Sequence, residues 1–513
     1  MLWIALHLPE LSLESFAATL PAAPADVAMP VALMDMHQIV AANPAAQALG
    51  VSSGLKRATA LALAPQILLG QADSTRDKQA VTGVAHAALA FTPSVTLAAP
   101  ADPAQAPSTV LLEVQASLRY FGGLRALLRR LHAALQPLGH RVHCATAPTA
   151  QGAALLARMP QASEGRHAAD LIALQRMLDA VPVWLLGPGR EHWEALQGMG
   201  LRELSDLRGL PRGGLARRFG AALLDELDCA RGVRADPRTW LQLPETFDSR
   251  LELFARADTT EQVLHGASML LARLVAWAAA RHAQVRRFTL HMQHEPRHRH
   301  DGDTELVSES TLEIALAEPS RDIAHLRVLL CERLARLQLA APTLELRLSC
   351  DDIALGAPLN GELFPTARSE REGLGRLIER LQARLGSERV HRLDPVEDHR
   401  PECATSVAGA RIAPSARPSK PLHAAAARRP VWLLPRPEPL HEQQQRPWLD
   451  GQPLQLLCGP ERIESGWWDA ALAERDYFIA QAGDGALVWI YRARLPMAMS
   501  EEAPGWFLQG RFG

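Results

Sequence analysis

The stretch from residue 246 to residue 351 constrains the fold most strongly, because strand-like and helix-like segments follow one another there in a fixed order. Apolar side chains that recur at every second position indicate strands, whereas a spacing of three to four indicates helices. The order is β-α-β-β-α-β, with strands at about 247–255, 284–293, 304–316 and 343–351 and helices at about 260–282 and 322–338. We therefore expect a small sheet with helices packed on one face.

The N-terminal part also alternates short apolar strands with helices. Strands are expected at 2–8, 31–34, 39–41, 95–97, 110–114 and 141–147, with Ala-rich or amphipathic helices between them. Such alternation predicts an α/β or α+β layer. Residues 184–232 are instead expected to be mostly helical, with glycines between the helices. A chain of 513 residues is long enough for about three or four domains and for a core that needs no disulfides.

Cysteine usage and charge exclude several classes of protein. The six cysteines are far apart and form no C-x-x-C pair, which argues against a structural zinc site and a disulfide framework. No apolar run reaches the roughly 18 residues of a membrane span, and no signal-peptide pattern is present. We expect a cytoplasmic protein that binds no membrane. The net charge of −2 excludes a uniformly basic nucleic-acid coat, so any DNA contact must come from local patches.

Beyond residue 352 the composition changes twice. An amphipathic helix is expected at about 370–386, and its apolar stripe either packs on its own domain or holds a partner: Leu374, Leu377, Ile378, Leu381 and Leu385. The stretch 401–447 is rich in Pro, Ala, Arg and Gln, has little apolar periodicity, and predicts a flexible linker. Aromatic residues and glycines return from 448 onward, which predicts a small β-rich module.

Five motifs stand in a fixed order along the chain. They are Ile39–Leu55 with Ala58–Pro65, Leu112–Gly123, the glycine-containing helical stretch Met199–Gly220, the β-α-β-β-α-β stretch, and Gly459–Phe478. In this order they resemble the Y-family translesion DNA polymerases. The fifth motif is similar to a C-terminal signature of the ImuB-type branch, the non-catalytic members found in bacterial DNA-damage cassettes. The resemblance covers nearly the whole length.

The resemblance implies an α+β multidomain fold. Its parts are a Y-family polymerase-like palm and fingers, a helical thumb, a β-α-β-β-α-β little finger and a small β-rich C-terminal module. The expected boundaries are palm and fingers at 1–165, a thumb with a helix-hairpin-helix-like element at 166–240, the little finger at 241–352, a clamp-binding motif and amphipathic helix at 353–400, the flexible linker at 401–447, and a C-terminal partner-binding module at 448–513.

The metal-ligand positions of the resembled family hold no carboxylate here. Active Y-family members clamp two Mg²⁺ ions with carboxylates from the first strand and from just before a later strand. Aligned on Glu14 and on Leu112-Glu113, the family pattern assigns these positions to Ala5, His7, Ser108 and Thr109. The resemblance therefore implies a protein that is not an enzyme, with no catalytic residue, no metal and no cofactor.

Other residues near these positions leave alternatives. Glu10, Glu14 and Glu113 are candidate substitute acids, although a solvated or structural role is the simpler interpretation. His7 is a candidate metal ligand, although a lone histidine on an apolar strand is more often a hydrogen-bonded core residue. The positions where the family grips the triphosphate hold Pro44, Gln47 and Ala154 in place of its Tyr, Arg and Lys.

Two sets of residues are candidate phosphate contacts. Arg286 and Arg287 lie on the second strand of the expected little finger, where the resembled family lies along DNA. The alternative is a solvated edge strand whose charges discourage aggregation. In the thumb, arginines stand beside glycines that let a backbone N–H approach a phosphate: Arg212, Arg217, Arg218 and Gly200.

A short motif follows the little finger: Asn360-Gly361-Glu362-Leu363-Phe364. It resembles the sliding-clamp-binding peptide that Y-family proteins carry there, in which a Leu-Phe pair enters an apolar pocket on the clamp. Asn360 replaces the usual Gln with the same amide group on a shorter stem. The alternative is that Leu363 and Phe364 pack on their own domain.

The resemblance as a whole implies an adaptor in mutagenic translesion synthesis during the SOS response. Such a protein binds primed or damaged DNA and the sliding clamp, and with the partner ImuA it recruits an error-prone DnaE-type polymerase. Two alternatives stay open. One is a weakly active translesion polymerase with relocated carboxylates, and the other is a protein-interaction adaptor that binds no DNA.

Overall fold

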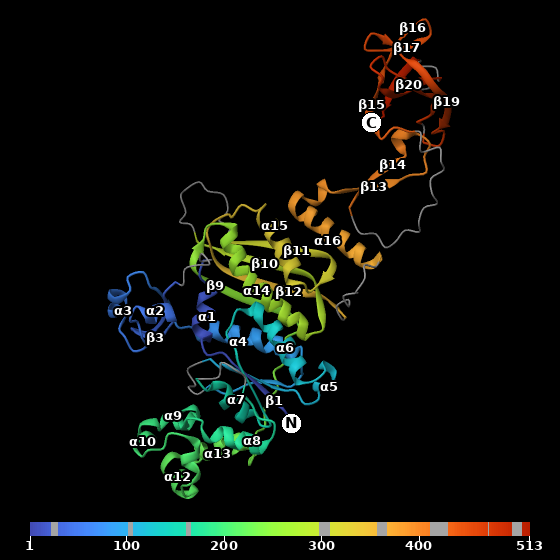
Figure 1. Cartoon of the computed structure of the whole chain (residues 1–513). Coiled ribbons are helices and arrows are strands. Elements are labelled where there is room, and N and C mark those ends of the chain that lie inside the picture. Colours follow the sequence, from blue (N-terminus) through green and yellow to red (C-terminus); the bar gives the residue numbers. More distant parts are fainter. Residues whose placement is uncertain are drawn as a thin grey trace. The chain divides into compact units, whose positions relative to one another are not determined.

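The computed structural model describes residues 1–21, 29–100, 106–160, 166–296, 308–356, 367–410, 429–469, 471–494 and 505–512 (Figure 1). The chain divides into two compact units, Met1–Arg384 and Leu385–Gly513, which we describe separately. Both helices and sheets are present in the first unit, and the second is dominated by strands. The predicted α+β fold with a β-rich C-terminal module is confirmed.

The palm is a five-stranded sheet with the first strand of the chain at its centre. The strand order is β5-β6-β1-β7-β8, that is Val95–Leu97, Thr109–Glu113, Trp3–His7, His143–Ala147 and Arg166–His167. Alternate residues of β1 face opposite cores, so Ile4 and Leu6 lie in one and Trp3 and Ala5 in the other. The first core contains α4 (Ser74–Leu89) and α6 (Leu124–Leu135), and the second contains α7 (Ala150–Arg158). Three shorter helices also contribute to the first core: α1 (Leu11–Ala17), α5 (Leu118–Phe121) and η1 (Gln136–Leu138).

The fingers form a separate small layer. Their three-stranded sheet has the order β3-β2-β4, with β2 at Val31–Asp35, β3 at Gln38–Ala42 and β4 at Leu68–Gln71. Helices α2 (Pro44–Ala48) and α3 (Arg57–Leu63) pack beside it. Asn43 caps α2, because its side-chain oxygen accepts a hydrogen bond from the Ala46 amide at 2.9 Å.

The thumb consists of short helices that share a core with α7. They are α8 (Leu171–Asp179), η2 (Val183–Leu185), α9 (Gly187–Glu191), α10 (Trp193–Gly198), α11 (Leu204–Arg208), α12 (Arg212–Phe219) and α13 (Ala221–Arg231). Gly200 turns the chain between α10 and α11 with φ +80°, a conformation that favours glycine. This helical region is the one that the glycine-punctuated sequence predicts.

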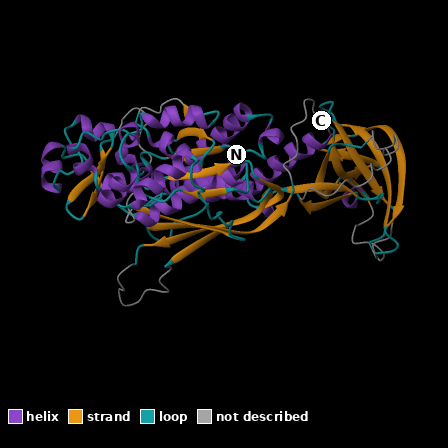
Figure 2. Cartoon of the chain, turned by 90° about the horizontal axis from the view of Figure 1, so that it is seen from below, coloured by secondary structure: helices purple, strands orange, loops and turns teal. Residues whose placement is uncertain are grey.

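The little finger has the β-α-β-β-α-β order that the sequence predicts. It comprises β9 (Phe247–Ala257), α14 (Thr260–Ala280), β10 (Ala283–His294), β11 (Glu309–Ser320), α15 (Ile323–Leu334) and β12 (Thr343–Leu355). The strands form one antiparallel sheet in the order β11-β10-β12-β9, and both helices cover the same core face. Figure 2 shows these long strands on one side of a layer of helices.

Helix α14 is the one described helix that is long and apolar enough to cross a membrane. Its large side chains Leu270, Leu271 and Trp277 are fully buried in the little-finger core. Ala272 and Ala276 pack instead with the palm core around α4. The apolar composition of α14 therefore serves two cores at once.

Helix α16 (Ala367–Leu385) carries the predicted apolar stripe, but most of that stripe faces solvent. Glu379 is buried instead, and its Oε2 lies 2.8 Å from Nε2 of His325 on α15. Arg376 and Arg380 pair with Asp322 and Glu332 of the little finger. Exposed on the other side are Leu374, Leu377, Leu381 and Leu385. The helix thus docks by polar contacts and by Ala383, which is buried in the little-finger core. The interpretation that the leucines of the stripe pack on their own domain is therefore wrong.

The second unit is a β-rich module. Its five-stranded sheet has the order β15-β22-β21-β20-β19, that is Trp432–Pro439, Gly505–Arg511, Leu487–Ala493, Ala473–Gln481 and Gln455–Ser465. Two smaller sheets accompany it: β13 (His391–Pro395) with β14 (Thr405–Gly409), and β16 (His441–Gln443) with β17 (Arg446–Leu449) and β18 (Gln452–Pro453). The short turns η3 (Ser387–Arg389) and η4 (Pro401–Cys403) precede β13 and β14.

The flexible linker predicted at 401–447 is longer than the structure allows. Strands β14, β15, β16 and part of β17 lie within it, and residues 411–428 lie outside the described residues. The Pro-rich composition hid β15, because proline is tolerated on an edge strand, and β15 is an edge of its sheet. The module therefore begins before residue 448.

Candidate functional site

Strand register brings the four carboxylate-free positions together. β1 runs antiparallel to β6, so His7 pairs with Thr109 and Ala5 pairs with Leu111. The Leu8 amide donates a hydrogen bond of 2.8 Å to the Ser108 carbonyl. His7 and Thr109 are about a hundred residues apart in the sequence, yet they meet at one end of two neighbouring strands. We call Ala5, His7, Ser108 and Thr109 the palm centre.

His7 is a neutral, hydrogen-bonded side chain of the palm centre. Its Nδ1 lies 3.0 Å from Oγ1 of Thr109, and its ring centre lies 6.3 Å from that of His143. Burial, together with the charges of Arg158 and His143, lowers the pKa of His7 to about 4. The imidazole ring is therefore uncharged at neutral pH and becomes charged only when the pH falls to about 4.

Arg158 brings a positive charge to the same place. It is the last residue of α7, and its Nε donates to Oγ1 of Thr109 at 3.4 Å while Nη2 donates to the Ala99 carbonyl at 3.3 Å. Burial lowers the pKa of its guanidinium, which nevertheless stays protonated in proteins. A guanidinium beside Thr109 opposes binding of a divalent cation there by like-charge repulsion. Sequence reasoning missed Arg158, since only the folded sheet brings the end of α7 to β6.

Glu226 on α13 is a carboxylate near Arg158 that sequence reasoning also missed. Its oxygens accept hydrogen bonds from the Gly187 amide at 3.0 Å and from Nε2 of Gln151 at 2.5 Å. Burial raises its pKa, and these hydrogen bonds and the charge of Arg158 oppose that rise. The carboxylate therefore joins the thumb to α7.

The acids considered as substitutes have partners of their own, although Glu10 lies near enough to His143 to raise the pKa of that imidazole. The Arg141 amide donates to Glu14 at 2.9 Å, and its guanidinium lies 3.6 Å from Glu10. Glu113 pairs with Trp3 at the other end of β1, about 13 Å along the strand from Thr109. Within the described ranges, no three His, Cys, Asp or Glu side chains form a group that could hold a metal ion.

The three residues at the positions where the resembled family grips the triphosphate have structural roles here. Pro44 begins α2, and Nε2 of Gln47 donates to the Ala42 carbonyl at 2.7 Å. Ala154 is fully buried in the core between palm and thumb. These three residues offer no cationic side chain to a phosphate.

On the face of the little-finger sheet that the helices do not cover, arginines form ion pairs with carboxylates. Arg287 lies between Glu313 at 3.7 Å and Asp352 at 3.6 Å. On the same sheet Nε of Arg347 donates to Asp248 at 2.7 Å. These carboxylates compete with phosphate for the guanidinium groups.

Arg286 differs from its neighbour. It sits where the β10 register shifts, between Val285 and Arg287, and its side chain is exposed. In the part of the chain that the structure describes, no ion pair involves Arg286. Of the two predicted phosphate contacts in the little finger, Arg286 is therefore the better placed.

The thumb candidates gather on α12. Arg217 and Arg218 are exposed in its last turn, and Arg212 at its start forms an ion pair with Asp228. The Gly200 amide lies on a different turn and donates to a carbonyl of α10 at 2.9 Å. The structure thus gathers the three arginines on one short helix and assigns Gly200 a turn-forming role.

The motif Asn360–Phe364, which the resemblance predicts to bind the sliding clamp, lies outside the described residues.

We compared the chain with protein families and with proteins of known identity. No protein-family model matches the chain. Protein ImuB from two strains of Caulobacter vibrioides is 28% identical over 496 residues, which cover 91% of this chain and 100% of each relative. The chain is similar to ImuB along nearly its whole length. The resemblance to the ImuB-type proteins is therefore confirmed.

Among solved structures, the chain is similar to an insertion ternary complex of Dbh DNA polymerase, with 16% identity and a TM-score of 0.39. It is also similar to DinB from Sulfolobus solfataricus, with 16% identity and a TM-score of 0.38. Each match covers 69% of this chain and 100% of the other.

Proposed function

We propose that this chain is a non-catalytic, Y-family polymerase-like adaptor in DNA-damage-induced mutagenesis. It binds primed or damaged DNA and the sliding clamp in the cytoplasm, and with ImuA it recruits an error-prone DnaE-type polymerase. The similarity to ImuB over 91% of the chain supports this assignment.

The composition of the palm centre carries the proposal. Nucleotidyl transfer by two metal ions needs carboxylates that hold the ions. Here the facing positions are His7 and Thr109, and the guanidinium of Arg158 donates to Thr109. Hydrogen bonds to a neutral imidazole and to a cation replace metal coordination in this interpretation. The polar side chains then stabilise the palm and perform no chemistry.

DNA binding rests on exposed arginines. Among the described residues, no carboxylate forms an ion pair with Arg286 on β10 or with Arg217 and Arg218 on α12, in contrast to Arg287. Cationic side chains of this kind give a salt-dependent and sequence-independent grip on phosphates. The carboxylates on the open sheet face favour the alternative of an adaptor that binds no DNA, so the salt dependence of DNA affinity distinguishes the two.

Clamp binding rests on the motif Asn360–Phe364 and its place after the little finger. Partner binding is assigned to the C-terminal module through the resemblance to the ImuB-type branch.

Reconstituted lesion bypass tests the proposal. A DnaE-type polymerase and the sliding clamp extend a primer across a template lesion with and without the full chain. We expect extension past the lesion to rise when the chain is added, and to fall back with the variant Leu363→Ala/Phe364→Ala. Stimulation that ignores the clamp motif contradicts the tether, and the absence of any stimulation contradicts the adaptor role.

A further inference from the structure

Two adjacent tryptophans project from the C-terminal module into solvent. Trp467 is 79% exposed and Trp468 is 55% exposed, on the loop that joins β19 to β20. Their rings meet edge to face, with centres 5.5 Å apart and planes at 84°. Aromatic side chains of this size are the commonest anchors of protein interfaces, and exposing two of them together is costly in water.

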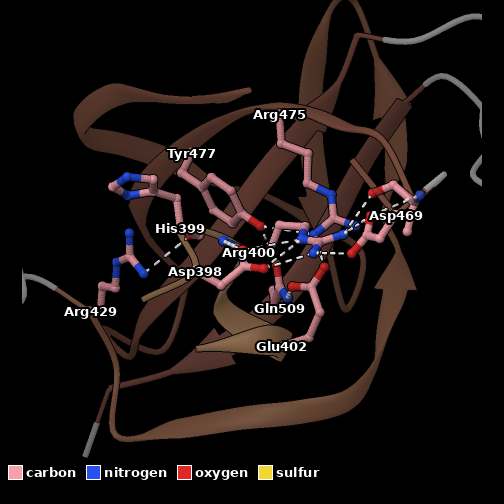
Figure 3. A network of polar contacts seen from close by, with 10 residues as sticks. Asp398, His399, Arg400, Glu402, Arg429, Asp469, Arg475, Tyr477 and Gln509 are labelled. Carbon is pink, nitrogen blue, oxygen red and sulfur yellow. Dashed lines mark hydrogen bonds and ion pairs between the residues drawn. The ribbon is translucent and has the colours of Figure 1, made fainter. Parts of the chain in front are cut away.

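A buried arginine makes hydrogen bonds to described residues of this loop (Figure 3). Arg400 is 4% exposed, and its Nη2 donates to Asp398 at 2.7 Å. Its Nη1 donates to Asp469 at 3.0 Å and to the Ala471 carbonyl at 2.9 Å, both within the loop. The guanidinium carbon lies 5.5 Å from the ring centre of Trp468. The fork of a guanidinium thus fixes the loop from two sides before any partner arrives.

Gly466 lets the loop approach Arg400 this closely. Its φ is +89°, and a Cβ atom there would lie 2.6 Å from Nη1 of Arg400 and 2.2 Å from the Ala471 carbonyl oxygen. The conformation of the loop at this position therefore requires a glycine.

The charge around the pair indicates what binds it. Beside the pair, Arg400 forms ion pairs with both Asp398 and Asp469, so this cluster keeps one net negative charge. The Asp469 side chain is 41% exposed and that of Arg400 is 5% exposed, so solvent meets a carboxylate at the rim while the guanidinium lies beneath. Such a rim repels nucleic-acid phosphates and attracts basic side chains.

We infer that Trp467 and Trp468 anchor a protein partner that offers an apolar pocket with an Arg- or Lys-rich rim. The inference rests on the proposed function, since it locates partner recruitment on one loop of the C-terminal module. The Arg400 fork supplies the rigidity, and the tryptophans supply the apolar area that the partner covers.

Binding measurements with single variants test the inference. The full chain is immobilised, and purified DnaE-type polymerase and purified ImuA from the same cassette are titrated separately by biolayer interferometry. Trp467→Ala and Trp468→Ala are compared with Trp432→Ala, which removes a 71% exposed tryptophan from β15 at the opposite edge of the same sheet. Arg400→Lys keeps the charge and removes the fork.

We expect each loop variant to weaken one of the two associations by about 30-fold or more, and Arg400→Lys to weaken it as well, while Trp432→Ala binds within about threefold. Partner affinities that stay unchanged in both loop variants overturn the inference and leave recruitment elsewhere on the chain. A loss of single-stranded DNA affinity with unchanged protein affinity also overturns it in favour of a base-stacking platform. If the unaltered chain binds neither protein, the proposed recruitment fails together with the inference.

Discussion

Protonation of His7 should destabilise the palm as the pH falls. Burial and the charge of Arg158 lower the folded pKa of His7 to about 4, whereas the ordinary value is 6.5. The unfolded chain therefore binds the proton more tightly than the folded one. The stabilising contribution is complete above pH 6.5, decreases as the pH falls from 6.5 to 4, and is lost below 4.

The size of the effect follows from the two pKa values. A difference of about 2.5 units corresponds to about 3 kcal/mol once the pH is below 4. At pH 5 the unfolded imidazole is almost fully charged and the folded one almost fully neutral, which costs about 2 kcal/mol relative to pH 8. The substitution His7→Asn keeps an amide near Oγ1 of Thr109 and removes the titrating group.

Hydrogen exchange of the β1 and β6 amides measures this cost locally. We expect the opening free energy of these strands to fall by about 2 kcal/mol more in the unaltered chain than in His7→Asn between pH 8 and pH 5, after correction for intrinsic exchange rates. His37→Asn is the matched control, because His37 is exposed in the turn between β2 and β3. An equal fall in the unaltered chain and in His7→Asn would refute the assignment of a buried neutral His7.

Three further predictions concern other parts of the chain. Arg286→Glu should weaken binding of a primed duplex and reduce its salt slope by about 1 or more in fluorescence anisotropy, and Arg287→Glu should do less, since Arg287 already faces Glu313 and Asp352. Leu363→Ala/Phe364→Ala should abolish clamp capture in a pull-down, whereas undiminished capture would remove the motif from the account. Gly466→Ala should destabilise the C-terminal module by at least about 1–3 kcal/mol in thermal denaturation, and Gly451→Ala, with φ +78° and no atom within 4 Å of its Cβ, should cost less.

Long, regular elements were predictable from the sequence. The strands β9, β10 and β12 each span eleven residues or more, and α14 spans 21, so their apolar periodicity is visible without any partner. The short strand β4 was not expected, because four residues after a proline carry too little pattern. The Pro-rich strand β15 was hidden for the opposite reason, since its composition is typical of a linker.

The site depended on contacts that no local pattern contains. The resemblance assigned His7 and Thr109 to the same set of metal-ligand positions, and the β1–β6 register pairs the two residues. Arg158, which donates to Thr109, could not be found in this way, because its position at the end of α7 has no motif. The partners of Arg287 were equally hidden, since they come from two other strands.

The same limit applies to the C-terminal module. Its aromatic composition indicated strands, but not which tryptophans remain exposed. The loop that carries Trp467 and Trp468 is contacted by Arg400, whose hydrogen bonds to Asp398 and Asp469 join segments 69 residues apart. Burial of a residue depends on such long-range pairs, and sequence periodicity does not report them.

Primer extension by the purified chain tests the central claim most directly. The full chain is incubated with a primed template and deoxynucleotides, first with Mg²⁺ and then with Mn²⁺, and its affinity for the same substrate is titrated in parallel. The account predicts binding without extension, because the palm centre holds Ala5, His7, Ser108 and Thr109 beside the Arg158 guanidinium. Extension that persists through repurification would contradict it and would assign the metal ions to other acids of this chain.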